Sequence, residues 1–279
     1  MEKVSIIMPC YNDGAYIEEA VASVRTQTYE NIELIIIDDG SDDPKTLAVL
    51  DKMKADGTTV LNTDRLRPAG ARNAGIAVAT GKYILPLDSD DIIEPDYVSR
   101  SVEVMESNGN IGVVYCHADL FGEESGPWQL PDYSLEAILL DNVIFVTALF
   151  RREDWEKVGG FRTTMKHGME DYDFWLSILE LGRDVCQLPE TLFHYRIKPV
   201  SRTTHFMGNP AVVRETYRDI YRQHPALYAR YRDEYAMVLR DALIDQIFMN
   251  RAYKKSIDVL NKLKQIPVVR KVVRKLILE

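Results

Sequence analysis

The sequence is poor in cysteine and has no long apolar run. Three cysteines, Cys10, Cys116 and Cys186, occur in 279 residues, and they form no Cys-x-x-Cys pair. Their number and spacing argue against a disulfide framework and a zinc site, so we expect reduced, buried thiols. No stretch has the length and hydrophobicity of a membrane span. Met1–Ser5 leads directly into a strand pattern without the basic and apolar regions of a signal peptide, which predicts a cytoplasmic protein.

Positive charge is in the minority. The chain carries 34 lysines and arginines against 43 aspartates and glutamates, a formal net charge of -9. This balance disfavours general nucleic-acid binding, so we predict no nucleic-acid partner. The length allows one large domain, or one domain with an appendage, and a sizeable core.

Several common motifs are missing. The turn after the first apolar run reads Tyr-Asn-Asp-Gly at 11–14, where a dinucleotide fold needs Gly-x-Gly-x-x-Gly. Gly70–Gly75 has the glycine spacing of a P-loop but lacks the lysine and the serine or threonine that bind phosphate. Ile37 stands where an aspartyl phosphatase needs its nucleophilic aspartate, and no Gly-x-Ser-x-Gly elbow occurs. The sequence therefore argues against these four classes of protein.

Short apolar runs alternate with helical periodicity in the first half of the chain. The runs that predict strands are Val4–Met8, Leu34–Ile37, Thr59–Leu61, Tyr83–Leu87 and Ile111–Tyr115. Their nearly continuous hydrophobicity favours a parallel sheet with helices on both faces. The first helix is predicted from an apolar stripe at 17, 20, 21 and 24, with Asn12 or Asp13 placed to cap its start.

Polar clusters follow three of the predicted strands. These clusters are Pro9–Asn12, Asp38–Ser41 and Asp88–Asp91. Ligands of open α/β sheets bind outside the carboxyl ends of the strands, so the clusters should converge on one cleft. The third cluster places three carboxylates within four positions, which indicates either a solvated turn or a divalent metal site.

Five motifs occur in the order and approximate spacing of the family 2 glycosyltransferases. They read VSIIMPCYND, ELIIIDDGSDD, AGARNAGIAVATGKYILPLDSDDIIEPD, VGGF and MEDYDFWLSILELG. The chain resembles that family over about residues 1–200. The resemblance implies the GT-A fold, which is an α/β fold with a mostly parallel sheet flanked by helices. We predict a catalytic domain at 1–208, divided into a nucleotide-binding half (1–91) and an acceptor-binding half (92–208), and a helical C-terminal extension at 209–279.

The resemblance implies inverting transfer of a hexosyl or hexosaminyl group from a nucleotide-diphosphate donor, with UDP favoured. It puts donor binding on the following residues: Pro9, Tyr11, Asn12, Asp39, Arg72 and Asp88. Tyr11 would stack on the base and Asp39 would accept a hydrogen bond from uracil. Arg72 would pair with phosphate and Asp88 would reach the ribose. The alternatives are a turn residue at Asp39 and a solvated surface residue at Arg72.

The same resemblance implies a metal cofactor, Mg²⁺ or Mn²⁺. Asp90, together with Asp91, would hold the cation against the diphosphate, and hard carboxylate oxygens suit both metals. The alternative is an acidic cap on the helix that begins near Pro95. His194 is a further candidate metal ligand, and the other interpretation is a hydrogen-bonded core histidine.

The acceptor side would use Asp171 as the general base, with Glu170 and Asp173 as competing candidates. The residues assigned to the acceptor site or to a lid over the donor are Glu170, Trp175, Arg196 and Arg202. The lid itself would span Lys198–Phe206 and exclude water when it closes.

After about residue 209 the pattern is helical. The last segment, 268–279, pairs basic residues with an apolar face and is typical of either a membrane-surface helix or a docking helix. We therefore predict a saccharide, glycolipid or other hydroxyl acceptor, with peripheral contact at the inner membrane face and oligomerisation left open. Two rival functions are a catalytically silent nucleotide-sugar-binding or scaffold protein and a sugar nucleotidyltransferase. The latter should show a Gly-rich, basic signature after the first strand, which this chain lacks.

Overall fold

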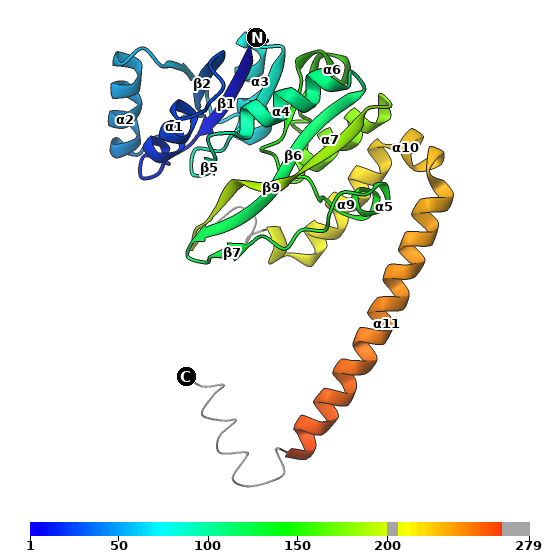
Figure 1. Cartoon of the computed structure of the whole chain (residues 1–279). Helices are drawn as coiled ribbons and strands as arrows, with labels where there is room; N and C mark the ends of the chain where they lie inside the picture. The colour runs from blue at the N-terminus through cyan, green and yellow to red at the C-terminus, as the bar shows by residue number, and fades with distance from the viewer. Residues whose placement is uncertain (200–205, 264–279) are drawn as a thin grey trace. The chain divides into compact units, whose positions relative to one another are not determined.

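The centre of the protein is one mixed β-sheet. In the computed structural model, which describes residues 1–199 and 206–263, nine strands form this sheet in the order β3-β2-β1-β4-β8-β6-β9-β5, with β7 paired to β6 (Figure 1). The strands are β1 Val4–Cys10, β2 Ile32–Asp38, β3 Thr59–Asn62, β4 Tyr83–Pro86, β5 Ile92–Ile93, β6 Ile111–Gly122, β7 Gly126–Pro127, β8 Leu149–Arg151 and β9 Asp184–Ile197.

Helices connect the strands, and further helices follow the last strand along the chain (Figure 1). They are α1 Ile17–Arg25, α2 Pro44–Ala55, α3 Arg67–Val78, α4 Tyr97–Ser107, α5 Leu135–Leu140, α6 Arg152–Val158, α7 Glu170–Glu180, α9 Pro210–Gln223, α10 Pro225–Arg230 and α11 Arg232–Leu263.

The first half of the sheet is parallel, as the sequence predicts. β1 pairs in parallel with both β2 and β4, and β2 pairs in parallel with β3. Burial of the strands on both faces favours this parallel pairing. Val4, Ile6 and Ile7 of β1 are fully buried, and so are Ile36 and Ile84 on the neighbouring strands. All the parallel strand ends in this half therefore open on one edge.

The second half adds antiparallel pairs to the sheet, which is therefore mixed. β8 pairs antiparallel with β4 and β6, β5 pairs antiparallel with β9, and β6 and β9 run in parallel along most of their length. β5 and β8 have only two and three residues. Strands this short carry no periodicity from which sequence could predict them.

Gly75 allows α3 to pack closely on the sheet. A Cβ atom at Gly75 would lie 2.6 Å from Cδ1 of Ile37 on β2 and 2.8 Å from Cγ2 of Ile7 on β1. This close approach fixes α3 against the strands, and with it the buried Arg72 one turn earlier.

The predicted cap of α1 is wrong. The helix receives no side-chain cap bond, and the carbonyl oxygen of Asp13 accepts from the backbone of Tyr16 and Ile17 instead. The Asn12 side chain accepts from the backbone nitrogens of Asp42 and Asp43, which ties the loop after β1 to the loop after β2. The Asp13 carboxylate binds Ser89 and Lys198. Both side chains therefore serve the strand-end loops.

The chain forms two compact units, Met1–Arg230 and Tyr231–Glu279. α9 and α10 belong to the first unit, and α10 contacts α7. Within the second unit, α11 is the element that the structure describes. Over the described ranges, no helix combines the length and the hydrophobicity needed to cross a bilayer. The basic segment at 268–279 lies outside these ranges.

Candidate active site

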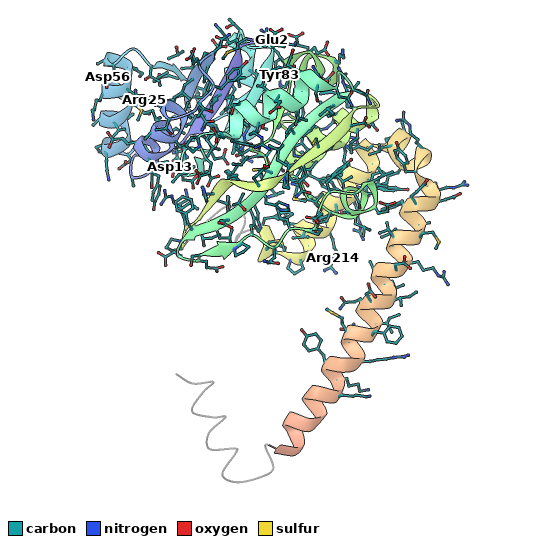
Figure 2. The ribbon with its side chains drawn as sticks, in the orientation of Figure 1. Glu2, Asp13, Arg25, Asp56, Tyr83 and Arg214 are labelled. Atoms are coloured by element: carbon teal, nitrogen blue, oxygen red, sulfur yellow. The ribbon has the colours of Figure 1, made fainter. Side chains whose placement is uncertain are left out.

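A cleft lies at the carboxyl edge of the sheet and has a volume of about 410 Å³. Its lining includes a group of charged residues, the charged wall, and a group of aromatic residues, the aromatic wall. The charged wall contains Arg72, Asp88, Asp91, Glu170 and Asp171. In Figure 2, Glu2 and Tyr83 are labelled at one end of the sheet and Asp13 at the other end. β1 and β4 run toward the end where Asp13 lies. Polar residues from both halves of the sequence thus meet at one edge.

Arg72 joins the two predicted halves of the catalytic domain. Its Nη2 lies 2.6 Å from Asp88 Oδ1, and its Nη1 lies 3.0 Å from Glu170 Oε1. Burial opposes the charge of Arg72, but the carboxylates of Asp88 and Glu170 outweigh burial and raise the pKa of the guanidinium. The alternative of a solvated surface residue is wrong, because Arg72 is 2% exposed.

A strained turn presents the carboxylates of α7. Met169, the residue before the helix, has φ 67, in the left-handed region that residues other than glycine rarely adopt. The helix then begins with Glu170 and Asp171. Asp171 Oδ2 accepts from Asn142 Nδ2 at 3.0 Å, and its Oδ1 accepts from the backbone of Tyr172. The carboxylate of Asp171 is therefore oriented and borders the cleft.

The two competing carboxylates of α7 are committed to other partners. Glu170 is buried against Arg72, as described above. Asp173 is buried, bonds both oxygens to Arg162 Nε at 3.1 Å, and lies 3.2 Å from His224 Nε2. Asp173 does not border the cleft. Of the three acidic residues, Asp171 is the one with both a partly exposed carboxylate and a place in the cleft wall.

The acidic turn after β4 sends its three carboxylates in different directions. Asp88 binds Arg72, Asp90 Oδ2 binds Lys198 at 2.6 Å, and buried Asp91 accepts from the backbone of Arg196. Burial and repulsion from Asp88 raise the pKa of Asp90. Burial and repulsion from Asp90 also raise the pKa of Asp91 well above its ordinary value. The turn therefore stabilises an added positive charge.

The end of β9 contacts this turn. Arg196 donates from Nε to the carbonyl oxygen of Asp90 at 2.8 Å, forms an ion pair with Glu19, and places its guanidinium 4.1 Å from the Phe121 ring centroid. His194 Nε2 lies 2.8 Å from Glu94 Oε1. His194 therefore has a hydrogen-bond partner, although its side chain is 24% exposed and does not lie in the core.

The predicted donor-side residues surround the loops after β1 and β2. Tyr11 is 38% exposed, and the Arg65 guanidinium lies 4.1 Å from its ring centroid. Asp39 accepts from Thr63 Oγ1 and from the backbone nitrogens of Leu66 and Arg67. Pro9 lies near the end of β1 opposite Ile37. Asp39 therefore organises the loop before α3 in addition to any contact with a base.

Part of the lining of the cleft, the aromatic wall, consists of aromatic rings. Trp128 stacks on Tyr195 with 4.7 Å between ring centroids and on Phe145 with 5.9 Å, and Phe145 contacts Phe193 at 4.5 Å. All four rings border the cleft. Trp175, predicted on the acceptor side, is fully buried and donates to the carbonyl of Ile144. This position gives Trp175 a packing role behind the wall.

The carboxylates near the turn after β4 fit a hard divalent cation, and few of them converge on one point. No group of three or more His, Cys, Asp or Glu side chains is arranged to hold a metal within 1–199 and 206–263. Asp90 and Asp13 nevertheless already hold a cation, the ammonium of Lys198. Mg²⁺ characteristically uses one or two carboxylates together with substrate phosphates, so these two suffice in number. Arg202 lies outside the described residues, as does most of the predicted lid.

The site residues that the sequence did not predict include Asn142, Trp128 and Asp13. Asn142 and Trp128 stand outside the five motifs and gain their positions only through tertiary packing. Asp13 did carry a signal, because it is the last residue of the motif VSIIMPCYND and directly follows the polar cluster Pro9–Asn12.

The comparisons with known proteins agree with this arrangement. The model of the family described as Glycosyl transferase family 2 matches residues 5–172. An uncharacterized glycosyltransferase of Haemophilus influenzae is 32% identical over 186 residues, which is 63% of this chain and 62% of that protein. A chondroitin synthase of Pasteurella multocida is 30% identical over 186 residues, 64% of this chain and 19% of that protein. The matches span 24% to 65% of the lengths of the first three curated relatives.

Solved structures show the same fold. TarS 1–349 of S. aureus in complex with UDP superposes with a TM-score of 0.66 at 20% identity, covering 85% of this chain and 70% of that one. A mannosyltransferase from Pyrobaculum calidifontis, in complex with GDP-Man and Mn²⁺, gives a TM-score of 0.58 at 17% identity, covering 91% and 83%. The sheet, the flanking helices and the acidic strand ends define a GT-A fold. The chain belongs to glycosyltransferase family 2.

Proposed function

We propose that this chain transfers a sugar from a nucleotide-diphosphate donor, with UDP as the favoured nucleotide, to a hydroxyl group of a saccharide or glycolipid. The observation that carries this proposal is the placement of Arg72. It connects Asp88, at the end of β4, to Glu170, beside Asp171 at the start of α7. A donor held at the strand ends and an acceptor held near α7 would thus meet in one cleft.

The donor side supplies the groups that a nucleoside diphosphate needs. Tyr11 offers a partly exposed ring for the base, Asp39 is buried next to it in the neighbouring loop, and Arg72 carries positive charge in the cleft wall. A divalent cation bound through Asp90 would stabilise the negative charge that develops on the leaving diphosphate. In support, structural neighbours were solved with UDP, with UDP-GlcNAc, and with GDP-Man and Mn²⁺.

The proposed chemistry is a single displacement with inversion. Asp171 takes the proton of the acceptor hydroxyl while that oxygen forms a bond to the anomeric carbon and the bond to the diphosphate breaks. Asn142 holds Oδ2 of Asp171, so the base is oriented before the acceptor arrives. The packing of Glu170 and Asp173 favours Asp171 over either neighbour.

The acceptor is best matched by a sugar ring. Trp128 and Tyr195 add apolar ring surface to the lining of the cleft, and the C–H face of a pyranose packs against aromatic rings. Chondroitin synthase and hyaluronan synthase are among the relatives of this chain. A growing polysaccharide or a glycolipid headgroup is therefore the class of acceptor that we propose.

A screen of nucleotide-sugars tests the proposal. The chain is incubated with UDP- and GDP-sugars, with and without Mn²⁺, in the presence of short oligosaccharide acceptors, and released nucleoside diphosphate is measured. We expect acceptor-dependent release with at least one UDP-sugar and loss of that release with a chelator. Donor binding without release, across all donors and acceptors, would contradict the proposal and indicate a silent binding protein.

Membrane contact through residues 268–279 is a proposal that rests on their sequence alone. The segment has basic residues at 270, 271, 274 and 275 among apolar ones, which favours an anionic lipid surface. Deletion of 268–279 should reduce sedimentation with anionic liposomes and leave transfer to a soluble acceptor unchanged. If the full chain does not bind such liposomes at low salt, the segment has another role.

A further inference from the structure

The ammonium of Lys198 occupies the position between Asp13 and Asp90. Its Nζ lies 2.6 Å from Asp90 Oδ2 and 3.0 Å from Asp13 Oδ1. The three side chains are 24%, 15% and 20% exposed, respectively for Lys198, Asp90 and Asp13. Ion pairs this shielded are screened by solvent less than surface pairs, so the contact fixes both carboxylates around one point.

Three separate segments build this contact. Asp13 follows β1, Asp90 follows β4, and Lys198 follows the last residue of β9, Ile197. Ser89 donates to the second oxygen of Asp13 at 3.0 Å, which orients that carboxylate toward the β4 turn. The lysine is also supported by the Tyr16 ring, whose centroid lies 5.4 Å from Nζ. The arrangement is thus specified by several elements and is no chance encounter of surface groups.

The charges of the site are incompletely balanced by this lysine. The carboxylates of Asp13 and Asp90 face one ammonium, so one negative charge remains, and a divalent cation in the same position would neutralise both carboxylates. A cation with a charge of two therefore fits better than the lysine, but it must displace an ammonium that already has two short contacts.

We propose that Lys198 is an internal competitor of the divalent cation for Asp90 and Asp13. This inference rests on the proposed role of Asp90 in metal binding. Lys198 holds the two carboxylates in place while no metal is bound, and it leaves them when the metal enters. The apparent metal affinity of the chain is then the intrinsic affinity of the carboxylates reduced by the strength of the lysine contact.

The test measures binding of Mn²⁺ alone to the full chain, by electron paramagnetic resonance of the free ion and without nucleotide. Charge-assisted hydrogen bonds predict that Lys198→Met binds Mn²⁺ about tenfold to a hundredfold more tightly than wild type. Lys198→Arg keeps the positive charge and should stay near wild type. Lys52→Met is the matched control, because it removes the same charge from an exposed pair with Glu18.

The outcomes separate this inference from the proposed function. The double variant Lys198→Met with Asp90→Asn should not bind Mn²⁺ more tightly than wild type, because the tighter binding of Lys198→Met requires the Asp90 carboxylate. If Lys198→Met and wild type bind Mn²⁺ equally while Asp90→Asn loses binding, the competition is wrong and the metal site stands. If Asp90→Asn binds Mn²⁺ as wild type does, the metal assignment fails and the competition fails with it. Thermal unfolding of each variant confirms that it is folded.

Discussion

Arg72 Nη1 and Glu170 Oε1 form a buried ion pair at 3.0 Å, with both side chains 2% exposed. Removing one partner of such a pair leaves an uncompensated charge in the interior. Arg72→Met leaves Glu170 buried without its arginine, so we expect a loss of about 3–5 kcal/mol in the free energy of unfolding. Urea denaturation measures this loss.

The matched control for that variant is Arg67→Met. Arg67 begins the same helix but is exposed, and we expect a change within about 0.5 kcal/mol. Equal effects of the two substitutions would mean that the Arg72 pair does not stabilise the junction between β4 and α7.

Asp90→Asn should remove the metal dependence of nucleotide binding. The variant keeps the size of the side chain and loses the charge that holds a cation, so Mn²⁺ should no longer increase the affinity for UDP. Asp96→Asn, at the exposed start of α4, is the control and should behave as wild type. Isothermal titration calorimetry with UDP, with and without Mn²⁺, measures the two affinities for each variant. An undiminished effect of Mn²⁺ in Asp90→Asn would place the metal on other residues.

Trp128→Ala tests the aromatic wall. Aromatic stacking contributes about 0.5–1.5 kcal/mol beyond burial, so the KM for a saccharide acceptor should rise about twofold to tenfold while kcat changes little. Trp128→Phe retains a stacking face and should recover most of the affinity. A change in donor KM with no change in acceptor KM would assign this wall to the donor.

Glu33 predicts how stability depends on pH. Burial raises the pKa of Glu33, but hydrogen bonds from Ser5 and Thr80 outweigh burial, and the net effect lowers the pKa below its ordinary value of 4.5. A lowered pKa in the folded state contributes stability that is present above the ordinary value and is lost as the pH falls through the folded value. The melting temperature of Glu33→Gln should therefore lie below that of wild type near neutral pH, and the gap should narrow as the pH falls below 4.5. A gap that is independent of pH would contradict this assignment.

The sequence predicted most of the charged site because the motifs lie at strand ends. β1, β2 and β4 are predominantly apolar runs, and a parallel arrangement brings the loops that follow them to one edge. The sequence also indicated Asp171 and Arg72, whose contacts with the cleft the structure shows.

What sequence could not predict depends on long-range packing. The Lys198 to Asp13 contact joins residues 185 positions apart, and no local periodicity specifies it. Asn142 reaches Asp171 from an irregular segment after α5. Trp175 follows the same apolar stripe as the core residues Phe174 and Ile178, and the pattern could not separate a core tryptophan from one that faces a ligand.

Turnover and donor binding of Asp171→Asn, measured on the same preparation, test the proposed transfer most directly. A general base contributes about 10²–10⁴-fold to the rate, and the donor is held mainly by the strand ends. We therefore expect kcat to fall by about 10²–10⁴-fold while the Kd for UDP with Mn²⁺ stays within about twofold of wild type. The amide oxygen still accepts from the backbone of Tyr172, and the amide nitrogen donates to the Asn142 oxygen once that side chain turns over, so the melting temperature should be largely retained. Wild-type kcat in Asp171→Asn, or a loss of UDP binding together with unfolding, would contradict the assignment of Asp171 as the base.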